Sequence, residues 1–208
     1  RNGVKAVRET AEAAAELGIE HLTLYAFSTE NWNRPKLEVS ALMMLLVDTL
    51  KKEINTLNKN NIKLHAIGDL TKLPKKTYKA LMDGIESTKN NTRMTLHLAL
   101  NYSSRWEIIE AAKKIAVLAK EGKLDPNSVD ETEFDKHLAT AGIPDPELLI
   151  RTSGERRLSN YLLYQLAYTE LYFTDNYWPE FRKVDFYKAL IDFQMRERRF
   201  GMTSDQIS

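Results

Sequence analysis

Apolar and polar positions follow two alternating patterns along the chain. Short, strongly apolar runs predict strands, and longer amphipathic stretches predict helices. The predicted strands cover residues 22–27, 62–67, 94–100, 148–152 and 170–173. The predicted helices cover residues 3–17, 40–60, 74–88, 105–121, 131–140, 160–166 and 184–200. Because strands and helices alternate throughout, we expect a single α/β domain over residues 1–208, with a mostly parallel sheet flanked by helices.

Ligands of such sheets bind beyond the carboxyl ends of the strands, so functional residues are expected in the turns that follow strands. The first such turn runs from Ser28 to Pro35 and contains Trp32 and Arg34. A mobile loop with an aromatic ring and a guanidinium suits a lid over an anionic substrate. Serine, asparagine and proline are also ordinary turn residues, and Trp32 could simply cap the core. Both interpretations stay open on composition alone.

A second turn follows the strand at 148–152 and gathers Arg151, Arg156 and Arg157 with several hydroxyl groups. Guanidinium groups bind phosphate oxygens in pairs, and the N-terminus of the helix predicted at 160–166 would add backbone donors. The alternative is a solvated turn in which the arginines pair with acids such as Glu155. Because 30 basic residues balance 29 acidic ones overall, this local excess favours a phosphate or diphosphate site.

Three weaker signals remain. Glu170, at the start of a predicted strand, could hold Mg²⁺, although most such glutamates are solvated or paired to an arginine. The unbroken apolar run at 41–47 is typical of a buried helix, and it would equally suit the wall of a lipid tunnel. The charged segment at 196–202 is typical of a helix end, or it carries Arg199 into an anion site.

Composition excludes several classes of site and of partner. The chain has no cysteine, which rules out disulfides and thiolate metal sites and fits a reducing compartment. Its net charge of +1 gives no general attraction to nucleic acid. No apolar run approaches the roughly 20 residues of a membrane span, so we expect a soluble cytoplasmic protein. The four histidines show no metal-ligand spacing, and His97 is expected to be a core or tunnel residue.

Five segments, taken in order, resemble the cis-prenyltransferase family of the undecaprenyl diphosphate synthase type. They are FSTENWNRP at 27–35, NYSSRWEI at 101–108, IRTSGERRLSNYLLYQLAYTELYFTD at 150–175, WPEF at 178–181 and RRFG at 198–201. The resemblance spans nearly the whole chain, and an ordered set of segments is far more specific than one motif.

The resemblance implies an α/β domain with a hydrophobic tunnel, a homodimer and Mg²⁺ as cofactor. The implied reaction adds isopentenyl diphosphate units to farnesyl diphosphate and gives a long cis-polyprenyl diphosphate. The bacterial pattern favours undecaprenyl diphosphate, which serves the synthesis of the lipid carrier of cell-wall precursors. The product also implies transient peripheral contact with the inner face of the membrane, and no nucleic-acid partner.

The resemblance also implies roles for individual residues. The mobile loop positions the substrates for catalysis, and the arginine turn holds the diphosphate of the isopentenyl unit. A glutamate binds magnesium, and a C-terminal Arg-x-Gly element reaches the partner's active site. The far end of the tunnel limits product length. The corresponding residues are Asn31, Arg34, Ser28 and Trp32 in the loop; Arg151, Arg157 and Ser159 at the diphosphate; Glu170 at the metal; Arg199 and Gly201 in the C-terminal element; and Met94 in the tunnel.

Two departures from the family pattern bear on activity. Family members begin with a strand and an Asp-Gly-Asn-Gly-Arg-Trp-Ala segment whose aspartate binds the metal, and we expect this segment upstream of Arg1. Without it, the chain is expected to be inactive. Arg156 stands where the family often has another side chain, a change that should be tolerated.

Two alternatives to catalysis are compatible with parts of this pattern. Some family relatives are non-catalytic partner subunits that lose the substrate-binding segments; this chain keeps Asn31, Arg34, Arg151, Arg157 and Glu170. Nucleic-acid binding by the arginine turn would need a wider basic face interleaved with aromatic residues.

Overall fold

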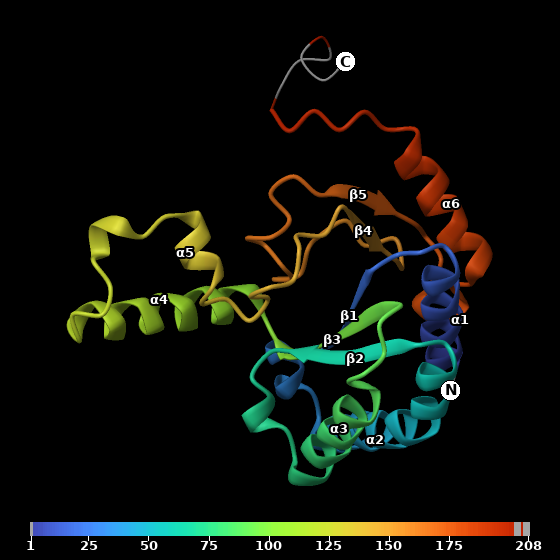
Figure 1. Cartoon of the computed structure of the whole chain (residues 1–208). Helices are drawn as coiled ribbons and strands as arrows, with labels where there is room; N and C mark the ends of the chain where they lie inside the picture. The colour runs from blue at the N-terminus through green and yellow to red at the C-terminus, as the bar shows by residue number, and fades with distance from the viewer. Residues whose placement is uncertain (1, 202–204, 206–208) are drawn as a thin grey trace. The chain divides into compact units, whose positions relative to one another are not determined.

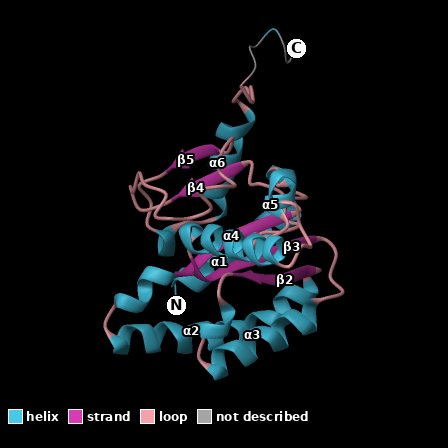
Figure 2. Cartoon of the chain, turned by 90° about the vertical axis from the view of Figure 1, so that its left-hand side faces the viewer, coloured by secondary structure: helices cyan, strands magenta, loops and turns pink. Residues whose placement is uncertain are grey.

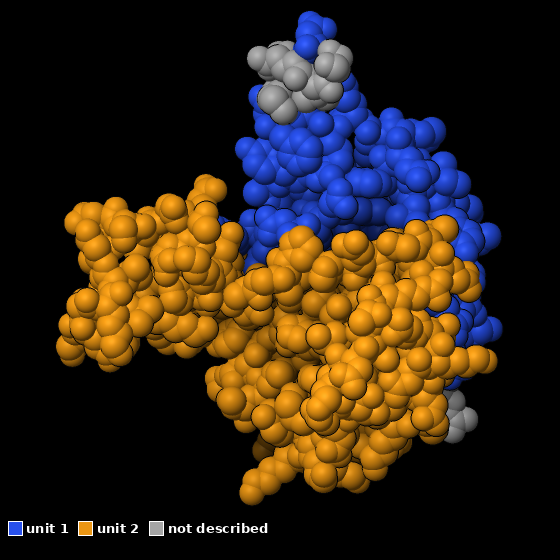
Figure 3. All heavy atoms as spheres, in the orientation of Figure 1, with its two compact units in different colours: residues 1–13, 145–158, 163–208 blue, residues 14–144, 159–162 orange. Residues whose placement is uncertain are grey.

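A computed structural model describes residues 2–201 and 205 of the 208-residue chain. Two residues that bear on the expectations above, Arg1 and Met202, lie outside this part. The described chain divides into two compact units (Figure 3). The larger unit comprises residues 14–144 and 159–162, and the smaller comprises residues 1–13, 145–158 and 163–208.

The larger unit is built on a parallel sheet of three strands in the order β1-β3-β2 (Figure 1). These are β1 (His21–Ser28), β2 (Ile62–Ile67) and β3 (Met94–Tyr102). The central strand, β3, is buried along almost its whole length, as expected for a strand with neighbours on both sides and covered faces. The helices of this unit are α2 (Lys36–Lys59), α3 (Lys75–Thr88), α4 (Ser104–Lys120) and α5 (Glu131–Asp135).

Helices α2 and α3 pack against each other and against β2, below the sheet in Figure 2. The hydroxyl of Thr88 accepts a hydrogen bond from the backbone N–H of Leu64 and donates one to the carbonyl of Gly84, both at 2.9 Å. A Cβ atom at Gly84 would lie only 3.1 Å from the Leu64 side chain. The sequence therefore permits α3 to approach the sheet closely at this point.

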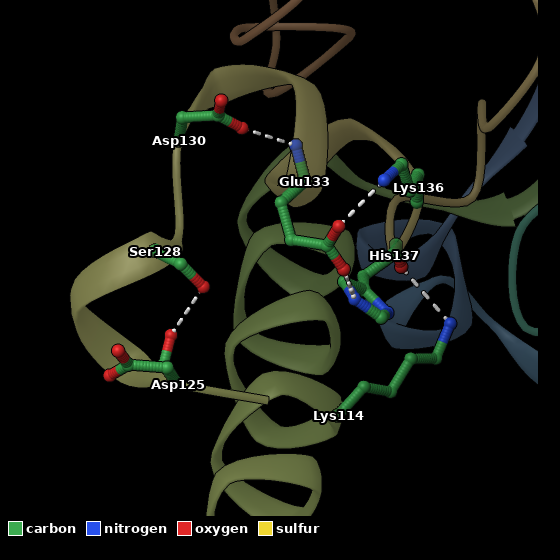
Figure 4. A network of polar contacts seen from close by, with 7 residues as sticks. All are labelled: Lys114, Asp125, Ser128, Asp130, Glu133, Lys136 and His137. Carbon is green, nitrogen blue, oxygen red and sulfur yellow. Dashed lines mark hydrogen bonds and ion pairs between the residues drawn. The ribbon is translucent and has the colours of Figure 1, made fainter. Parts of the chain in front are cut away.

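Polar contacts tie the short helix α5 to α4 (Figure 4). The side chain of Asp130 caps α5 by accepting from the backbone N–H of Glu133 at 2.8 Å. Glu133 in turn contacts His137 at 3.1 Å, and Lys114 of α4 donates to the His137 carbonyl at 3.0 Å. The Asp130 side chain satisfies an N-terminal donor of a helix too short to be stable alone, and the Lys114 contact holds the segment after the helix against α4.

The smaller unit contains a parallel pair of strands, β4 (Leu148–Arg151) and β5 (Glu170–Phe173). It also holds α6 (Lys183–Gln194) and most of α1 (Asn2–Glu16). The rings of Trp178 and Phe181 stack with centroids 5.8 Å apart. Gly3 of α1 lies against this stack, since a Cβ atom there would be 3.7 Å from the Trp178 ring.

The α/β class and the parallel strands predicted from the sequence are confirmed, and every predicted strand is present. The strands in the described residues form two sheets rather than one. That residues 1–208 form a single domain stays a prediction.

Three helix predictions are corrected. The segment 160–166 is not helical, because Asn160 and Leu162 have left-handed φ angles of 58° and 45° that interrupt any right-handed helix. Helix α5 ends at Asp135 and α6 ends at Gln194, each several residues earlier than predicted.

The apolar run at 41–47 is only half buried. Met43 and Val47 face the core, whereas Met44 and Leu45 are 65% and 42% exposed. The expectation of a helix buried on nearly all sides is therefore wrong for its outer face, and the hydrophobic tunnel stays a prediction. Of the helices in the described part of the chain, none has the length and apolar character needed to cross a bilayer.

Three histidines form a row across the sheet, one from each strand. His97 of β3 is 2% exposed, and its Nε2 and Nδ1 atoms lie 3.0 Å from Nδ1 of His21 and Nδ1 of His65, respectively. The assignment of His97 to the core is thus confirmed. Burial, together with the charges of the neighbouring His65 and His21 imidazoles, lowers the pKa of His97 to about 3. Burial and the charge of Lys63 also lower the pKa of His65.

This row predicts a pH-dependent stability. Unfolded His97 binds a proton near its ordinary pKa of 6.5, whereas the folded residue resists protonation down to about pH 3. The unfolded chain therefore binds more protons between these values, and the free energy of unfolding falls as the pH drops through this window. From His97 alone, we expect a loss of about 2 kcal/mol between pH 7.5 and pH 5, measured by urea denaturation.

The variant His97→Asn should flatten this slope, because its amide can hydrogen-bond without taking up a proton. A wild-type stability that is constant over this range would contradict the prediction.

Candidate functional site

The loop after β1 lies at the carboxyl end of the larger sheet, where the sequence predicts functional residues. It forms the short 3₁₀ helix η1 (Thr29–Asn33). The side-chain oxygen of Asn31 accepts from the backbone N–H of Ser28 at 3.0 Å, and the Asn31 carbonyl accepts from Arg34 at 3.1 Å. Asn31 therefore closes the turn on the last residue of β1.

The indole of Trp32 is anchored on one side, and the residue is 37% exposed to solvent. Its ring meets Phe27 edge-on, with centroids 5.1 Å apart. Its Nε1–H donates to the side-chain oxygen of Asn101 at 2.7 Å. Trp32 thus combines a core contact with an exposed part that a ligand can reach.

Asn101 links the ends of two further strands. Its Nδ2 donates to the carbonyl of Asp69, the second residue after β2, at 2.8 Å, and its own carbonyl accepts from the backbone N–H of Asp69 at 3.2 Å. The preceding residue, Gly68, approaches β3 so closely that a Cβ atom would lie 2.0 Å from the carbonyl oxygen of Leu100. The carboxyl ends of the three strands are therefore joined through one asparagine.

Asn160 joins η1 to the start of α4. Its carbonyl accepts from the backbone N–H of Ser104 at 2.8 Å. Its side-chain oxygen accepts from the backbone N–H of Arg105 at 3.0 Å. Both are donors that a helix N-terminus otherwise leaves unsatisfied. The side-chain N–H₂ of Asn160 donates to Glu30 at 2.7 Å. Partial burial acts to raise the pKa of Glu30. The hydrogen bonds to its carboxylate, of which that from Asn160 is the strongest influence, outweigh this and hold the pKa below its ordinary value.

Arg34 follows η1 and pairs with Glu38 at 2.8 Å, with both side chains about half exposed. Exposed pairs of this kind contribute little to stability, roughly 0–1 kcal/mol. Arg34 can therefore exchange Glu38 for an anionic ligand at small cost.

In the smaller unit, the arginine turn has a tightly bonded backbone. Thr174 donates to the carbonyl of Arg151 at 2.9 Å, Gly154 donates to Thr174 at 3.0 Å, and Ser153 donates to Asn176 at 2.8 Å. Ser153 and Gly154 both have left-handed φ angles, 71° and 67°. These bonds hold the backbone of the turn against the residues that follow β5.

The sequence leaves two interpretations of this turn open, a phosphate site and a solvated turn with arginine–acid pairs, and the side chains bear on both. Arg157 is exposed and pairs with Glu155, as the alternative of a solvated turn predicted. The helix N-terminus expected to assist the arginines is absent, because the segment after them is a turn. Ser159 is exposed with a left-handed φ of 53°, and it belongs to the larger unit.

Glu170 is paired to an arginine. Its Oε2 accepts from Arg196 at 2.9 Å, and Arg196 also pairs with Asp192 at 2.5 Å. In the register of β4 and β5, Glu170 lies beside Leu148, at the opposite end of the strands from Arg151. The separation along the strand is about 10 Å at roughly 3.3 Å per residue.

The donor set at Glu170 fits magnesium only in part. Mg²⁺ is usually held by one or two carboxylates together with substrate phosphates and water. Glu170 supplies one carboxylate, which Arg196 engages. Among the residues that the structure describes, no three histidine, aspartate or glutamate side chains are grouped to hold a metal ion.

The last predicted site residues lie beyond α6 and in β3. Arg199 is exposed and pairs with Glu197 at 2.8 Å. Helix α6 ends at Gln194, so Arg199 lies beyond the helix end, and its role in an anion site stays a prediction. Met94 is buried at the start of β3, on the same face of the sheet as Leu64.

Sequence reasoning did not single out Asn101 or Asn160. Both have left-handed φ angles, 48° and 58°, which asparagine tolerates better than most residues. An asparagine directly after an apolar strand run was the available signal for Asn101. No local pattern marks Asn160, whose partners lie far away in the sequence.

Comparison with known proteins gives matches over nearly the whole chain. Residues 1–201 match the family model described as "Putative undecaprenyl diphosphate synthase". An isoprenyl transferase of Chlorobaculum tepidum is 50% identical over 205 residues, 99% of this chain and 77% of that protein. A ditrans,polycis-undecaprenyl-diphosphate synthase of Pasteurella multocida, (2E,6E)-farnesyl-diphosphate specific, is 49% identical over 97% of this chain and 84% of that protein.

Solved structures agree with these matches. Lavandulyl diphosphate synthase from Lavandula x intermedia, in complex with dimethylallyl diphosphate, superposes with a TM-score of 0.93 at 39% identity, over 96% of this chain and 86% of that one. A probable undecaprenyl diphosphate synthase from Campylobacter jejuni gives a TM-score of 0.85 at 37% identity, over 96% and 92% of the two chains.

The close approach at Gly68 predicts a severe effect of Gly68→Ala. The added Cβ would meet backbone, which cannot move aside as a flexible side chain can. We expect a loss of more than about 3 kcal/mol in the free energy of unfolding, measured by urea denaturation.

Gly122→Ala is the matched control, since Gly122 also has a positive φ but has open space around its Cβ position. It should cost only about 1–2 kcal/mol, the strain of a left-handed alanine. Equal losses in the two variants would contradict the role assigned to Gly68.

Proposed function

Since this chain belongs to the undecaprenyl diphosphate synthase family, we propose that it adds isopentenyl diphosphate units to farnesyl diphosphate and forms a long cis-polyprenyl diphosphate. The proposed product is undecaprenyl diphosphate, used in the synthesis of the lipid carrier for peptidoglycan precursors. The observation that carries the proposal is the similarity to synthases and isoprenyl transferases at about half of all positions over nearly the full chain.

The loop at the carboxyl end of the larger sheet is the proposed site of the allylic substrate. Asn31 and Arg34 act on the reacting groups, Trp32 contacts the allylic chain, and Ser28 forms the base of the loop. The exposed part of the indole and the weakly held Arg34 guanidinium support these roles. A cation here would stabilise the negative charge that develops on the departing diphosphate.

The arginine turn is the proposed site of the isopentenyl diphosphate. Arg151 and Arg157 bind its phosphate oxygens, and a fixed backbone beneath them limits the entropy lost on binding. The pairing of Arg157 with Glu155 is exposed, so a phosphate can replace the carboxylate. Ser159 is assigned to substrate binding on the family resemblance alone.

Magnesium is the proposed cofactor, with Glu170 as one ligand. When bound, the ion would neutralise diphosphate charge. Glu170 would have to give up its contact with Arg196, and Arg196 would keep Asp192 as a partner.

The reaction proposed for this site breaks the carbon–oxygen bond of the allylic diphosphate and forms a carbon–carbon bond to the isopentenyl unit. The electron pair of the isopentenyl double bond attacks the allylic carbon, and the diphosphate leaves with the electrons of the broken bond. Loss of a proton from the isopentenyl unit then forms the new cis double bond. The chain's own contribution is to hold both diphosphates and to keep the reacting carbons together.

We also propose a homodimer in which Arg199 and Gly201 reach the partner's active site. The growing product enters a hydrophobic tunnel lined by Met94. The protein is proposed to be cytoplasmic, with transient peripheral contact at the inner face of the membrane for product release.

The proposed diphosphate site predicts that Arg157→Ala raises the KM for isopentenyl diphosphate by at least tenfold, since a charge-assisted contact is worth roughly 1.5–3 kcal/mol. The fold should be unaffected, because Arg157 is exposed and pairs only with Glu155 among the described residues. Steady-state kinetics should use protein that includes the segment expected upstream of Arg1. Arg156→Ala, the exposed neighbour, is the control and should stay near wild type; an unchanged KM in Arg157→Ala removes Arg157 from the site.

The activity itself is tested with farnesyl diphosphate, labelled isopentenyl diphosphate and Mg²⁺, followed by sizing of the extracted lipids. We expect long cis-polyprenyl products that disappear with EDTA. A folded protein with its upstream segment that forms no such product would overturn the proposed function.

A further inference from the structure

Asn101 is a buried polar side chain with both of its polar groups in use. It is 1% exposed, its oxygen accepts from Trp32 at 2.7 Å, and its N–H₂ donates to the Asp69 carbonyl at 2.8 Å. A buried amide that loses such a partner keeps its full desolvation cost, so these two bonds define one favoured orientation of the side chain.

The hydrogen bond from Trp32 to Asn101 is a directional anchor between η1 and β3. The edge-on contact with Phe27 is apolar and permits the indole to slide or tilt. The bond between Asn31 and Ser28 stays within the loop, and that between Glu30 and Asn160 holds the other side of η1. Within the described chain, Asn101 is the residue whose hydrogen bond fixes the direction of the indole.

The backbone at Asn101 makes this geometry possible. Its φ of 48° is left-handed, and it turns the side chain back between the loops that follow β1 and β2. Glycine adopts such a conformation without strain, whereas alanine does not. Replacement by glycine therefore removes the amide and leaves the path of the backbone intact.

We propose that Asn101 is a positioning residue for the allylic substrate, which it controls by holding the Trp32 indole at the carboxyl end of the central strand. This inference rests on the proposed function of the loop. Asn101 acts through Trp32, and its loss frees the indole to turn away from the substrate chain. The isopentenyl diphosphate site in the arginine turn does not depend on it.

The test uses Asn101→Gly in protein that includes the upstream segment. The KM for farnesyl diphosphate should rise about three- to tenfold, as expected for one lost hydrogen bond, and the KM for isopentenyl diphosphate should stay within twofold. In a Trp106→Phe, Trp178→Phe background in which the tryptophan expected in the upstream segment is also replaced by phenylalanine, the emission of Trp32 should shift to longer wavelength without any substrate. Unchanged emission, or equal changes in both KM values, would overturn the proposal.

Asn61→Gly is the matched control. Asn61 is also a left-handed asparagine, with φ of 57°, but it lies before β2, and its side chain bonds to Thr92. This variant should keep wild-type emission and both KM values. If Asn61→Gly raised the KM for farnesyl diphosphate as much as Asn101→Gly does, the increase would reflect lost stability and not the lost hydrogen bond to Trp32.

A second measurement avoids mutation of Asn101. The indole N–H of Trp32, assigned in a ¹⁵N spectrum by its absence in Trp32→Phe, should exchange with solvent more slowly than a free indole. Exchange at the free rate in the substrate-free protein would overturn the proposal even if Asn101→Gly fails to fold. A wild-type protein that forms no polyprenyl product would instead refute the proposed function, and the emission and exchange results would still report on the anchor.

Discussion

The burial of β3 between two parallel neighbours is the constraint on which the larger unit depends. Its apolar side chains face both sides of the sheet, so β1 and β2 must lie beside it and the helices must cover it. Parallel pairing brings all three carboxyl ends to one edge. A polar residue at the end of β3 therefore lies between the loops of both neighbours, as Asn101 does.

The sequence predicts the elements whose pattern is strong and local. The strands at 62–67 and 170–173 have the predicted bounds, because short apolar runs between turn residues leave few alternatives. The helix predicted at 160–166 fails because its amphipathic pattern is overridden by left-handed residues. In that conformation Asn160 forms hydrogen bonds with Glu30 and with the start of α4. No local pattern reveals these partners.

The same limit applies to the site residues. The sequence predicts which charged residues gather after the strands, and the loop of Asn31 and Trp32 lies where parallel topology requires. The pairing of Arg157 with Glu155 is one of the alternatives that the sequence leaves open, whereas no pattern singles out Arg196 as the partner of Glu170. Glu155 pairs with the predicted diphosphate residue Arg157, and Arg196 pairs with the predicted metal residue Glu170. Such pairs are weakly held when exposed, so their presence is compatible with ligand binding at Arg157.

The contacts within the histidine row also couple the tautomers of its three imidazoles. Each of its two nitrogen–nitrogen contacts holds a single proton, and neutral His97 carries one proton on one of its two nitrogens. If His97 donates to His65, it must accept from His21, and the reverse arrangement requires both partners to change. The tautomers of three residues on three strands are therefore correlated: the exposed imidazole of His21 reports the tautomer of a ring that solvent does not reach.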